Sequence, residues 1–336
     1  MTGLRPPTEA EWDKAVAALA ADRGEVVLAC HVSPDADAVG SMLALAHTLR
    51  RRGTRVLPSF SAPFELAGSL AGLPGVDLLV PPEQLPAAPG LLVTLDTGSA
   101  DRLGSLAPLV DSAAEVLVVD HHASNTRFGD VNLIDAASPA SAVLCRELLR
   151  RLGLPLDTEI ATALYTGLVT DTGRFQYQAT SPDTHLLAAE LLAAGVQQYE
   201  VAKAVFETNN IGYLRLVADA LGRVAQVPEA SLVWTRVDQA DLAAHGIDMD
   251  ETEGLIDLVR TDAASDVAAV LKQQPEGGYK VSLRSKGATD VGKMATRFGG
   301  GGHKYAAGYT AELDAEAAMA ALVAELTGAP ARAPVG

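Results

Sequence analysis

Short apolar runs alternate with amphipathic stretches along the first 195 residues. Val26-Val-Leu-Ala-Cys30 is continuously apolar and Leu91-Leu-Val-Thr-Leu95 is apolar except for its threonine, as expected of strands covered on both faces in a parallel sheet. Between such runs, apolar residues recur every three or four positions, the spacing of a helix that packs one face. Thr8 and Glu11 have the spacing of a capping box, which predicts a helix to about residue 21. We therefore predict a doubly wound, mostly parallel α/β sheet, with strands near 25–30, 55–60, 91–95 and 115–120 and helices near 8–21, 38–51, 139–152, 158–170 and 183–194.

The pattern changes after residue 195. Helical spacing continues over 196–221, which we interpret as a helical linker. The sequence Pro275-Glu-Gly-Gly278 is typical of a hairpin turn between two strand-like runs. The second half has predicted strands near 222–227, 231–237, 266–274 and 278–285, and predicted helices near 250–260, 290–297 and 314–326. We expect a first domain over 1–195, the linker over 196–221, a second, smaller α/β domain with a mixed or antiparallel sheet over 222–328, and a disordered tail over 329–336.

Length and composition favour two packed domains inside a cell. The chain has 336 residues, of which 48% are hydrophobic, enough for two cores. The two cysteines, Cys30 and Cys145, make no disulfide framework, which suits a reducing cytoplasm. The sequence contains no apolar run close to the ~18 to 20 residues that a membrane span needs. Its acidic start does not resemble a secretory signal. We expect a cytoplasmic protein without a membrane partner.

The charge distribution limits the partners. A formal net charge of −16 opposes binding to long duplex nucleic acid, which lysine and arginine drive by neutralising phosphates. One stretch, 279–305, is nevertheless basic. It contains Lys280, Arg284, Lys286, Lys293, Arg297 and Lys304 against Asp290 alone. This stretch is either a solvated basic face or a local site for a small anionic substrate.

Histidines and aspartates follow three of the predicted strands. The first strand leads into His31-Val-Ser-Pro-Asp35-Ala-Asp37, and Asp120-His121-His122 follows Val116-Leu-Val-Val119. Asp96 comes directly after a third strand. Carboxyl ends of parallel strands lie at one edge of the sheet, so we expect these side chains to meet there. Gathered carboxylates repel one another unless a cation lies between them, so the sequence predicts a metal site.

Each cluster differs in specificity. A D-x-D pair alone also occurs in solvated turns, and Asp96 alone could be a helix cap. Two adjacent histidines after a buried strand have few structural uses. Asp171 is predicted at the carboxyl end of a helix, where a carboxylate opposes the helix dipole and a nearby cation would offset the cost. Oxygen and imidazole donors without thiolates favour Mn²⁺ or a similar ion over structural zinc, and two such ions suit hydrolysis of a phosphoester.

The second domain offers anion-binding features. Four successive glycines, Gly299–Gly302, allow close approach of the backbone to a ligand and can present amide groups as an anion nest, although such runs are often flexible loops. His303 follows them directly. Arg284 on a neighbouring predicted strand can bind a phosphate through two parallel hydrogen bonds. Together these residues favour substrate binding.

These clusters resemble the motifs of the DHH phosphoesterase superfamily. The triplet Asp120-His121-His122 matches the motif that names it, and the other motifs occur in the same order. Val281-Ser-Leu-Arg284-Ser285 and Gly299-Gly-Gly-Gly302-His303, followed by Ala306-Ala307-Gly308, resemble the DHH-associated domain. The chain is similar in size and domains to the nano-RNase and pAp-phosphatase group. Ser33 and Ala36 stand where the family often has Asn and Gly.

The resemblance implies a role for each matching residue. His31, Asp35 and Asp96 would bind one Mn²⁺, and Asp96 would bridge to the second. Asp37, His121 and Asp171 would complete the second site. The resemblance also implies that His122 contacts the scissile phosphate and assists the leaving group, with Asp120 orienting the histidines. The substrate-binding residues that it implies are Arg284, Ser285, Gly300, Gly301, Gly302 and His303.

The expected activity is hydrolysis of short oligoribonucleotides or of 3′-phosphoadenosine 5′-phosphate (pAp) by water that two Mn²⁺ ions activate. Cyclic di-AMP and its linear product pApA are further candidate substrates within the group. Alternatives are a Mn-dependent inorganic pyrophosphatase and a non-catalytic nucleotide sensor. A homodimer is the expectation from the family. A sensor is expected to lack some of the ligands, and this sequence has all of them.

Overall fold

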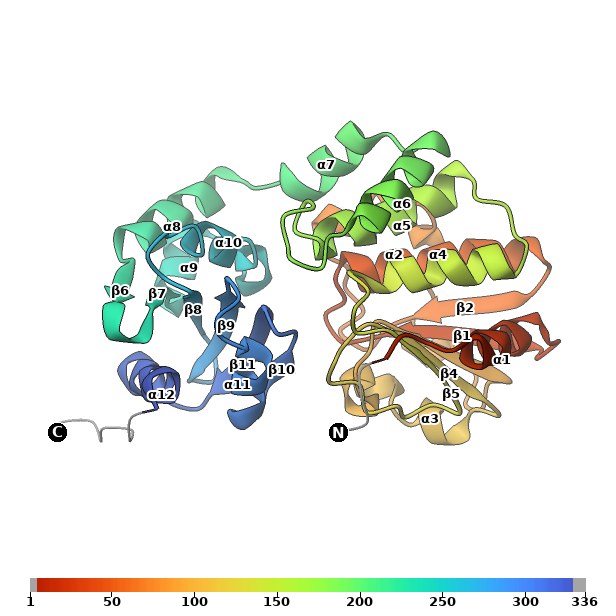
Figure 1. Cartoon of the computed structure of the whole chain (residues 1–336), viewed down its shortest axis with the longest axis horizontal. Coiled ribbons are helices and arrows are strands. Elements are labelled where there is room, and N and C mark those ends of the chain that lie inside the picture. The colour runs from red at the N-terminus through yellow and green to blue at the C-terminus, as the bar shows by residue number, and fades with distance from the viewer. Residues whose placement is uncertain (1–4, 329–336) are drawn as a thin grey trace. The chain divides into compact units, whose positions relative to one another are not determined.

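The structure is a computed structural model, which describes residues 5–328 (Figure 1). The predicted tail over 329–336 lies outside the described residues. The chain forms two compact units, Met1–Thr208 and Asn209–Gly336. The predicted linker over 196–221 is divided between them: Val201, Val205 and Phe206 of α7 (Gln198–Phe206) pack into the core of the first unit, whereas Tyr213 and Leu216 of α8 (Ile211–Gly222) pack into the second.

The first unit contains a parallel sheet whose strand order has a topological switch point. Its described strands are β1 (Glu25–Cys30), β2 (Arg55–Ser59), β3 (Leu91–Leu95), β4 (Val116–Asp120) and β5 (Val131–Ile134). They pair in parallel in the order β2-β1-β3-β4-β5. After β1 the chain adds β2 on one side of β1, and it then crosses to the other side to add β3, β4 and β5. This reversal of direction makes a topological switch point between β1 and β3. Ligands of open α/β sheets bind at such a point.

Helices cover both faces of this sheet (Figure 1). The larger core lies under α2, α4 and α5, and a smaller one lies under α3 and the 3₁₀ segment η4 on the opposite face. The described helical elements of this unit are α1 (Glu9–Ala20), α2 (Ala36–Arg51), the 3₁₀ segments η1 (Gly68–Leu70), η2 (Val76–Leu78), η3 (Pro82–Gln84) and η4 (Ala100–Leu106), and α3 (Leu109–Ser112), α4 (Ser141–Arg151), α5 (Thr158–Asp171), α6 (Pro182–Ala193) and α7. The central strands are buried on both faces, which explains their continuous apolar runs.

The elements predicted for this unit are confirmed, including the capping box of Thr8 and Glu11. One strand, β5, was not predicted. It has four residues and the half-buried Asn132 interrupts its apolar pattern. The pairing of β5 with β4 makes it a strand. A pattern this short does not separate a strand from a loop.

The second unit contains a mixed sheet with the order β10-β11-β9-β8-β7-β6. β7 and β8 pair in parallel, and the other neighbours pair antiparallel. Its described strands are β6 (Ala225–Val227), β7 (Leu232–Val237), β8 (Val267–Gln273), β9 (Tyr279–Ser285), β10 (Gly301–Gly302) and β11 (Ala306–Ala311). The predicted hairpin between β8 and β9 is present. The second α/β domain with a mixed sheet is thereby confirmed.

One core lies on each face of this sheet. α8, α9 (Gln239–His245) and α10 (Leu255–Val259) pack on one face, and α11 (Val291–Arg297) and α12 (Ala315–Thr327) pack on the other. β11 was not predicted as a strand because alanine and glycine have low strand propensity. β11 is nevertheless a strand because it pairs with β9 over six residues. Within residues 5–328, we find no helix with the length and apolar character to cross a membrane.

Candidate functional site

The chain segments that follow β1, β3 and β4 meet at the carboxyl edge of the first sheet. His31 follows β1 directly, Asp96 follows β3, and Asp120 is the last residue of β4. All three are at least nine-tenths buried. The sequence prediction that these clusters converge is borne out by the distances that follow.

The first group of donors consists of His31, Asp35 and Asp96. Nε2 of His31 lies 3.6 Å from Oδ2 of Asp96 and 3.9 Å from Oδ2 of Asp35. One donor atom from each residue lies within 4.8 Å of the others, a spacing that could hold a metal ion. Asp35 is the exposed member, and its other oxygen, Oδ1, caps α2 by accepting from the amides of Asp37 and Ala38.

The second group consists of Asp37, Asp96 and His121, and it meets the same distance condition. Nε2 of His121 lies 3.3 Å from Oδ1 of Asp96 and 3.9 Å from Oδ2 of Asp37. Asp171, the last residue of α5, places Oδ2 3.1 Å from the same Nε2. Asp96 therefore belongs to both groups, with Oδ2 toward His31 and Oδ1 toward His121.

Backbone carbonyls orient both imidazoles toward these carboxylates. Nδ1 of His31 donates to the carbonyl of Val32 at 2.8 Å, and Nδ1 of His121 donates to the carbonyl of Ser138 at 3.1 Å. Each bond leaves Nε2 facing the acidic cluster. Histidines that bind metals usually have such a second contact, which fixes the tautomer and the ring.

The backbone adopts a left-handed conformation at two positions of the site. Asp96 has φ +53°, which aspartate tolerates better than most side chains do. Ser33 has φ +50°, a region in which asparagine, the residue that the family resemblance implies at this position, is favoured. Ala36 is the first residue of α2, so it has no need of a glycine. The two departures from the family pattern are therefore compatible with the loop.

The electrostatics of the site call for added positive charge. Burial and the Asp96 and Asp171 carboxylates raise the pKa of Asp37 well above its ordinary value. Burial opposes the charge of Asp96, yet hydrogen bonds from His121 and His31 hold its pKa well below the usual range. Burial likewise opposes protonation of His31, and the carboxylates of Asp96 and Asp35 still raise its pKa to about 9. The carboxylates thus draw protons onto the imidazoles.

This donor set fits divalent cations. Asp35, Asp37, Asp96 and Asp171 carry four negative charges when ionised, and two divalent cations carry four positive charges. Carboxylate and neutral imidazole are ligands of Mn²⁺ and similar ions. Buried charges are tolerated when they are paired or coordinate a metal.

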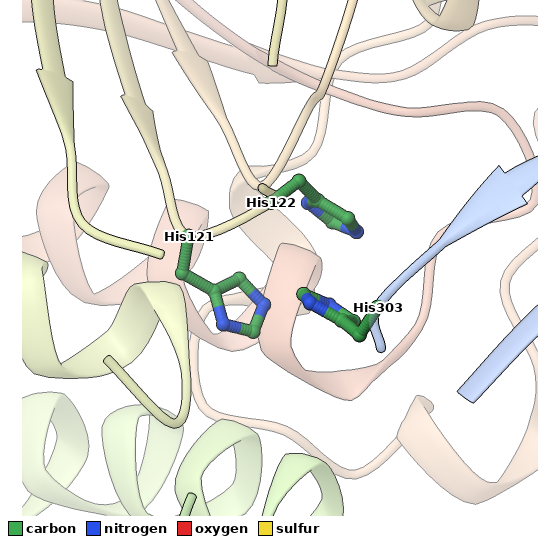
Figure 2. Close-up of side chains that lie close together, drawn as sticks. All are labelled: His121, His122 and His303. Carbon is green, nitrogen blue, oxygen red and sulfur yellow. The ribbon is translucent and has the colours of Figure 1, made fainter. Parts of the chain in front are cut away.

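His122 lies beside this cluster, where its Nδ1 is 3.7 Å from Oδ1 of Asp96, and Asp96, Asp120 and His122 form a further group of donors with the same spacing. Figure 2 shows His122 next to His121, directly after β4. Its Nδ1 lies 2.7 Å from Oδ1 of the buried Asp120. Oδ2 of Asp120 accepts from the side-chain amide of Asn125 at 2.6 Å, and that amide also donates to the carbonyl of Thr97. Asp120 thus orients His122, and a contact of His122 with substrate would use Nε2.

In the second unit, Arg284 and Ser285 lie on opposite faces of β9. Arg284 pairs with Ala268 on the face of α10, and its Nε lies 3.8 Å from Oδ1 of Asp257. Ser285 is buried and its hydroxyl donates to Asp266 at 3.4 Å. The structure therefore brings Arg284 to a partly exposed position and uses Ser285 to hold its own loop.

The glycine run has a structural explanation at two of its positions. A Cβ on Gly300 would lie 2.1 Å from the carbonyl of Gly308, and one on Gly302 would lie 2.6 Å from that of Ala306. These glycines allow β10 to pair closely with β11. A Cβ on Gly301 would meet nothing within 4 Å, so the structure leaves this position open to a ligand. His303 follows β10 directly (Figure 2).

Two residues of the site were missed in the sequence. Asn125 supports Asp120, and Ser141 donates its hydroxyl to Oδ1 of Asp96 at 2.9 Å. Neither carries a distinctive local pattern. Ser141 is 45 residues from its partner along the chain, so only the folded structure reveals the contact.

Comparison with known proteins agrees with this organisation. The model of the DHH family, N-terminal domain, matches residues 25–168, and that of the DHHA1 domain matches residues 230–329. The bifunctional oligoribonuclease and PAP phosphatase NrnA of Thermus thermophilus is 34% identical over 309 residues, which cover 90% of each chain.

Two solved structures share the fold. A crystal structure of an exopolyphosphatase-related protein from Bacteroides fragilis matches with a TM-score of 0.86 at 23% identity over 96% of both chains. RecJ from Thermus thermophilus in complex with Mn²⁺ matches with a TM-score of 0.54 at 18% identity, over 97% of this chain and 55% of RecJ. From the two domain matches and the extent of the identity, this chain belongs to the DHH family of phosphoesterases, as an NrnA-like member.

Proposed function

We propose that this protein hydrolyses short oligoribonucleotides and pAp with the help of two divalent ions, in the first place Mn²⁺. The observation that carries the proposal is the pair of donor groups that share Asp96. The printed activities of the Thermus relative, oligoribonuclease and PAP phosphatase, support the substrate class. The DHH membership supports the reaction type.

We divide the donor residues between two cation sites. His31, Asp35 and Asp96 would hold one ion, and Asp37, Asp96, His121 and Asp171 would hold the other. When bound, such ions supply Lewis acidity toward the phosphate and toward the attacking water. Asp96 offers one oxygen to each side, which suits a bridging carboxylate.

His122 serves as the general acid of the proposed reaction. The oxygen of a water molecule bonds to phosphorus, the ester P–O bond breaks, and Nε2 of His122 gives a proton to the departing oxygen. The attacking water loses a proton to the solvent, and a proton from the solvent restores His122 for the next turnover. Asp120 fixes the ring through Nδ1 and stabilises its protonated form. Asn125 holds the second oxygen of Asp120 and thereby keeps the carboxylate in place.

The second unit selects the nucleotide. Arg284 carries a partly exposed guanidinium, which can bind a phosphate through two parallel hydrogen bonds. His303 and the open backbone at Gly301 provide further polar contacts in this unit. These groups would bind the part of the substrate that does not react. The family resemblance adds pApA and cyclic di-AMP as further candidate substrates.

Steady-state hydrolysis by the purified full-length chain tests the proposal. The substrates are pAp, pApA, RNAs of two to five nucleotides, cyclic di-AMP and pyrophosphate, each with Mn²⁺ and after treatment with EDTA. We expect turnover of pAp and of the short RNAs, loss of turnover with EDTA, and recovery when Mn²⁺ is restored. Turnover of pyrophosphate alone would identify a pyrophosphatase, and no turnover with Mn²⁺ bound would identify a sensor; either result overturns the proposal.

A further inference from the structure

We propose that residues 138–142, which lead into α4, position three ligands of the metal centre, and that Ser141 is the positioning residue of this segment. The inference rests on the proposed function because it concerns the same centre. His121, Asp37 and Asp96 come from different elements, yet each hydrogen-bonds to this one segment. None of the segment's side chains belongs to either donor group.

The contacts of Ser141 reach two carboxylates at once. Its backbone amide donates to Oδ2 of Asp37 at 2.6 Å, and its hydroxyl donates to Oδ1 of Asp96 at 2.9 Å. The next amide, of Ala142, donates to Oδ1 of Asp37 at 2.9 Å. Ser141 is fully buried, so water does not compete for these bonds. Oδ2 of Asp37 and Oδ1 of Asp96 each accept one hydrogen bond from the segment, and a carboxylate oxygen has two lone pairs, so each of these oxygens can also bind a cation.

The start of α4 needs a partner from elsewhere in the chain. The first amides of a helix have no acceptor within it, and a side chain at the N-cap position usually serves. That position in α4 is Ala140, whose methyl group accepts nothing. Asp37 fills the role from α2, 104 residues earlier. The helix terminus thus gains its cap, and Asp37 gains a fixed orientation.

Close packing keeps Asp37 in this position. A Cβ on Gly167 of α5 would lie 2.7 Å from Oδ1 of Asp37, and one on Gly40 of α2 would lie 2.3 Å from the carbonyl of Ala163. The two glycines therefore let α2 and α5 approach closely with the carboxylate beside α5. With α5 on one side and the α4 amides on another, Asp37 has little freedom to turn.

The hydroxyl of Ser141 restricts the orientation of the Asp96 carboxylate in a similar way. Oδ1 of Asp96 faces His121 and accepts from Ser141, while Oδ2 of Asp96 faces His31. A fixed plane is what a carboxylate needs to offer one oxygen to each of two ions. Contacts that orient metal ligands typically change metal affinity by 10- to 100-fold when they are removed.

Metal binding to the purified full-length chain tests this role. We would titrate Mn²⁺ into metal-free protein by isothermal calorimetry for the natural sequence, Ser141→Ala, Ser141→Thr and Ser265→Ala. Ser265→Ala is the matched control, because this buried serine of the second unit also donates its hydroxyl to a carboxylate, that of Asp262, at 2.6 Å. We expect Ser141→Ala to weaken Mn²⁺ binding roughly 10- to 100-fold.

The other variants decide what the loss means. Ser141→Thr restores a hydroxyl and should return the affinity to about that of the natural chain, and Ser265→Ala should stay within about twofold of it. Unchanged affinity in Ser141→Ala, or an equal loss in Ser265→Ala, overturns the role of the hydroxyl. Should Ser141→Ala not fold, a folded Ser141→Thr with weakened binding overturns it and one with natural binding upholds it. A natural chain that binds no Mn²⁺ instead overturns the proposed metal centre itself.

Discussion

The two units both bury charged side chains, but they balance the charge differently. In the first unit, four carboxylates of the two donor groups and of Asp171 surround the imidazoles of His31 and His121. In the second, Oε1 of Glu253 lies 2.8 Å from Nζ of the buried Lys272 and 3.3 Å from Nζ of Lys280. Glu253 itself is half exposed; its partial burial opposes its charge, yet these lysines lower its pKa to about 2.

The difference separates a binding site from a structural pair. In the second unit, Glu253 neutralises the buried Lys272, and Lys280 is half exposed to water, so this pair is complete without a ligand. The carboxylates of the first unit exceed their partners and recruit protons, which a divalent cation can replace. A cluster of buried charged groups therefore indicates a ligand site when the net charge of the cluster is far from zero.

The largest expected effect comes from Asp96→Ala, which removes the residue shared by both donor groups. We expect hydrolysis of pAp to fall by about 10⁴-fold or more, because the positions of both ions depend on this carboxylate. Metal content, measured by elemental analysis after purification, should fall with it. Asp101→Ala, an exposed aspartate in η4, is the control and should retain both properties. Full metal content with more than about a tenth of the activity would show that Asp96 is not the bridge.

His122→Ala should separate chemistry from metal binding in the same unit. Its Nδ1 is held by Asp120, and we assign it to proton transfer. The rate should fall by ~10² to 10⁴-fold, the usual contribution of a general acid. The metal content should remain that of the natural chain. Loss of metal in this variant would place His122 among the ligands and remove the proposed general acid.

Arg284→Ala should affect the nucleotide more than the chemistry. Loss of a charge-assisted contact of ~1.5 to 3 kcal/mol corresponds to a fall of roughly 10- to 200-fold in kcat/KM for pAp or pApA. Hydrolysis of the small ester bis-p-nitrophenyl phosphate should change by no more than about threefold. Lys293→Ala is the control, since this exposed lysine belongs to the same basic stretch and pairs with Asp290. Equal losses on both substrates would contradict a selecting role for the second unit.

The smallest effect concerns the balanced pair. Glu253→Gln leaves Lys272 buried without its counter-ion and should lower the stability of the second unit by about 1 kcal/mol, below the value for fully buried pairs because Glu253 is half exposed. Lys272→Met removes the buried charge itself and should change the stability of the second unit very little. Trp234 lies in β7, so its fluorescence during urea unfolding, in a Trp12→Phe background, follows this unit.

A greater loss of stability in Lys272→Met than in Glu253→Gln would contradict the comparison, because Lys272 would then stabilise the second unit through contacts other than its ion pair.

The stability of the second unit should also depend on pH in the acid range, with a defined sign. A lowered pKa for Glu253 means that its contribution to stability is present above about pH 4.5 and is lost as the pH falls toward 2. Glu253→Gln should flatten that part of the pH profile.

The sequence predicted those parts of the structure that short-range patterns encode. The apolar runs of β1, β3 and β4 identified the strands, and parallel topology then required that His31, Asp96 and Asp120 gather at one edge. Lys272 was predicted within a strand, but its burial depends on α10 and on Glu253, nineteen residues earlier. β11 and the support from Ser141 depend on pairing across the fold. Such contacts leave no periodic signal in the chain.

The cap that Asp37 provides for α4 also bears on how the first unit folds. The contact closes a loop of about a hundred residues, and the entropy of closing it must be met before the first turn of the helix is secured. Distant contacts of this kind slow folding and form late. Asp37 also belongs to the second donor group, so the packing of α4 against Asp37 and the assembly of that donor group occur together. A nascent chain that ends before residue 141 lacks the cap, and metal-binding competence is acquired together with native packing.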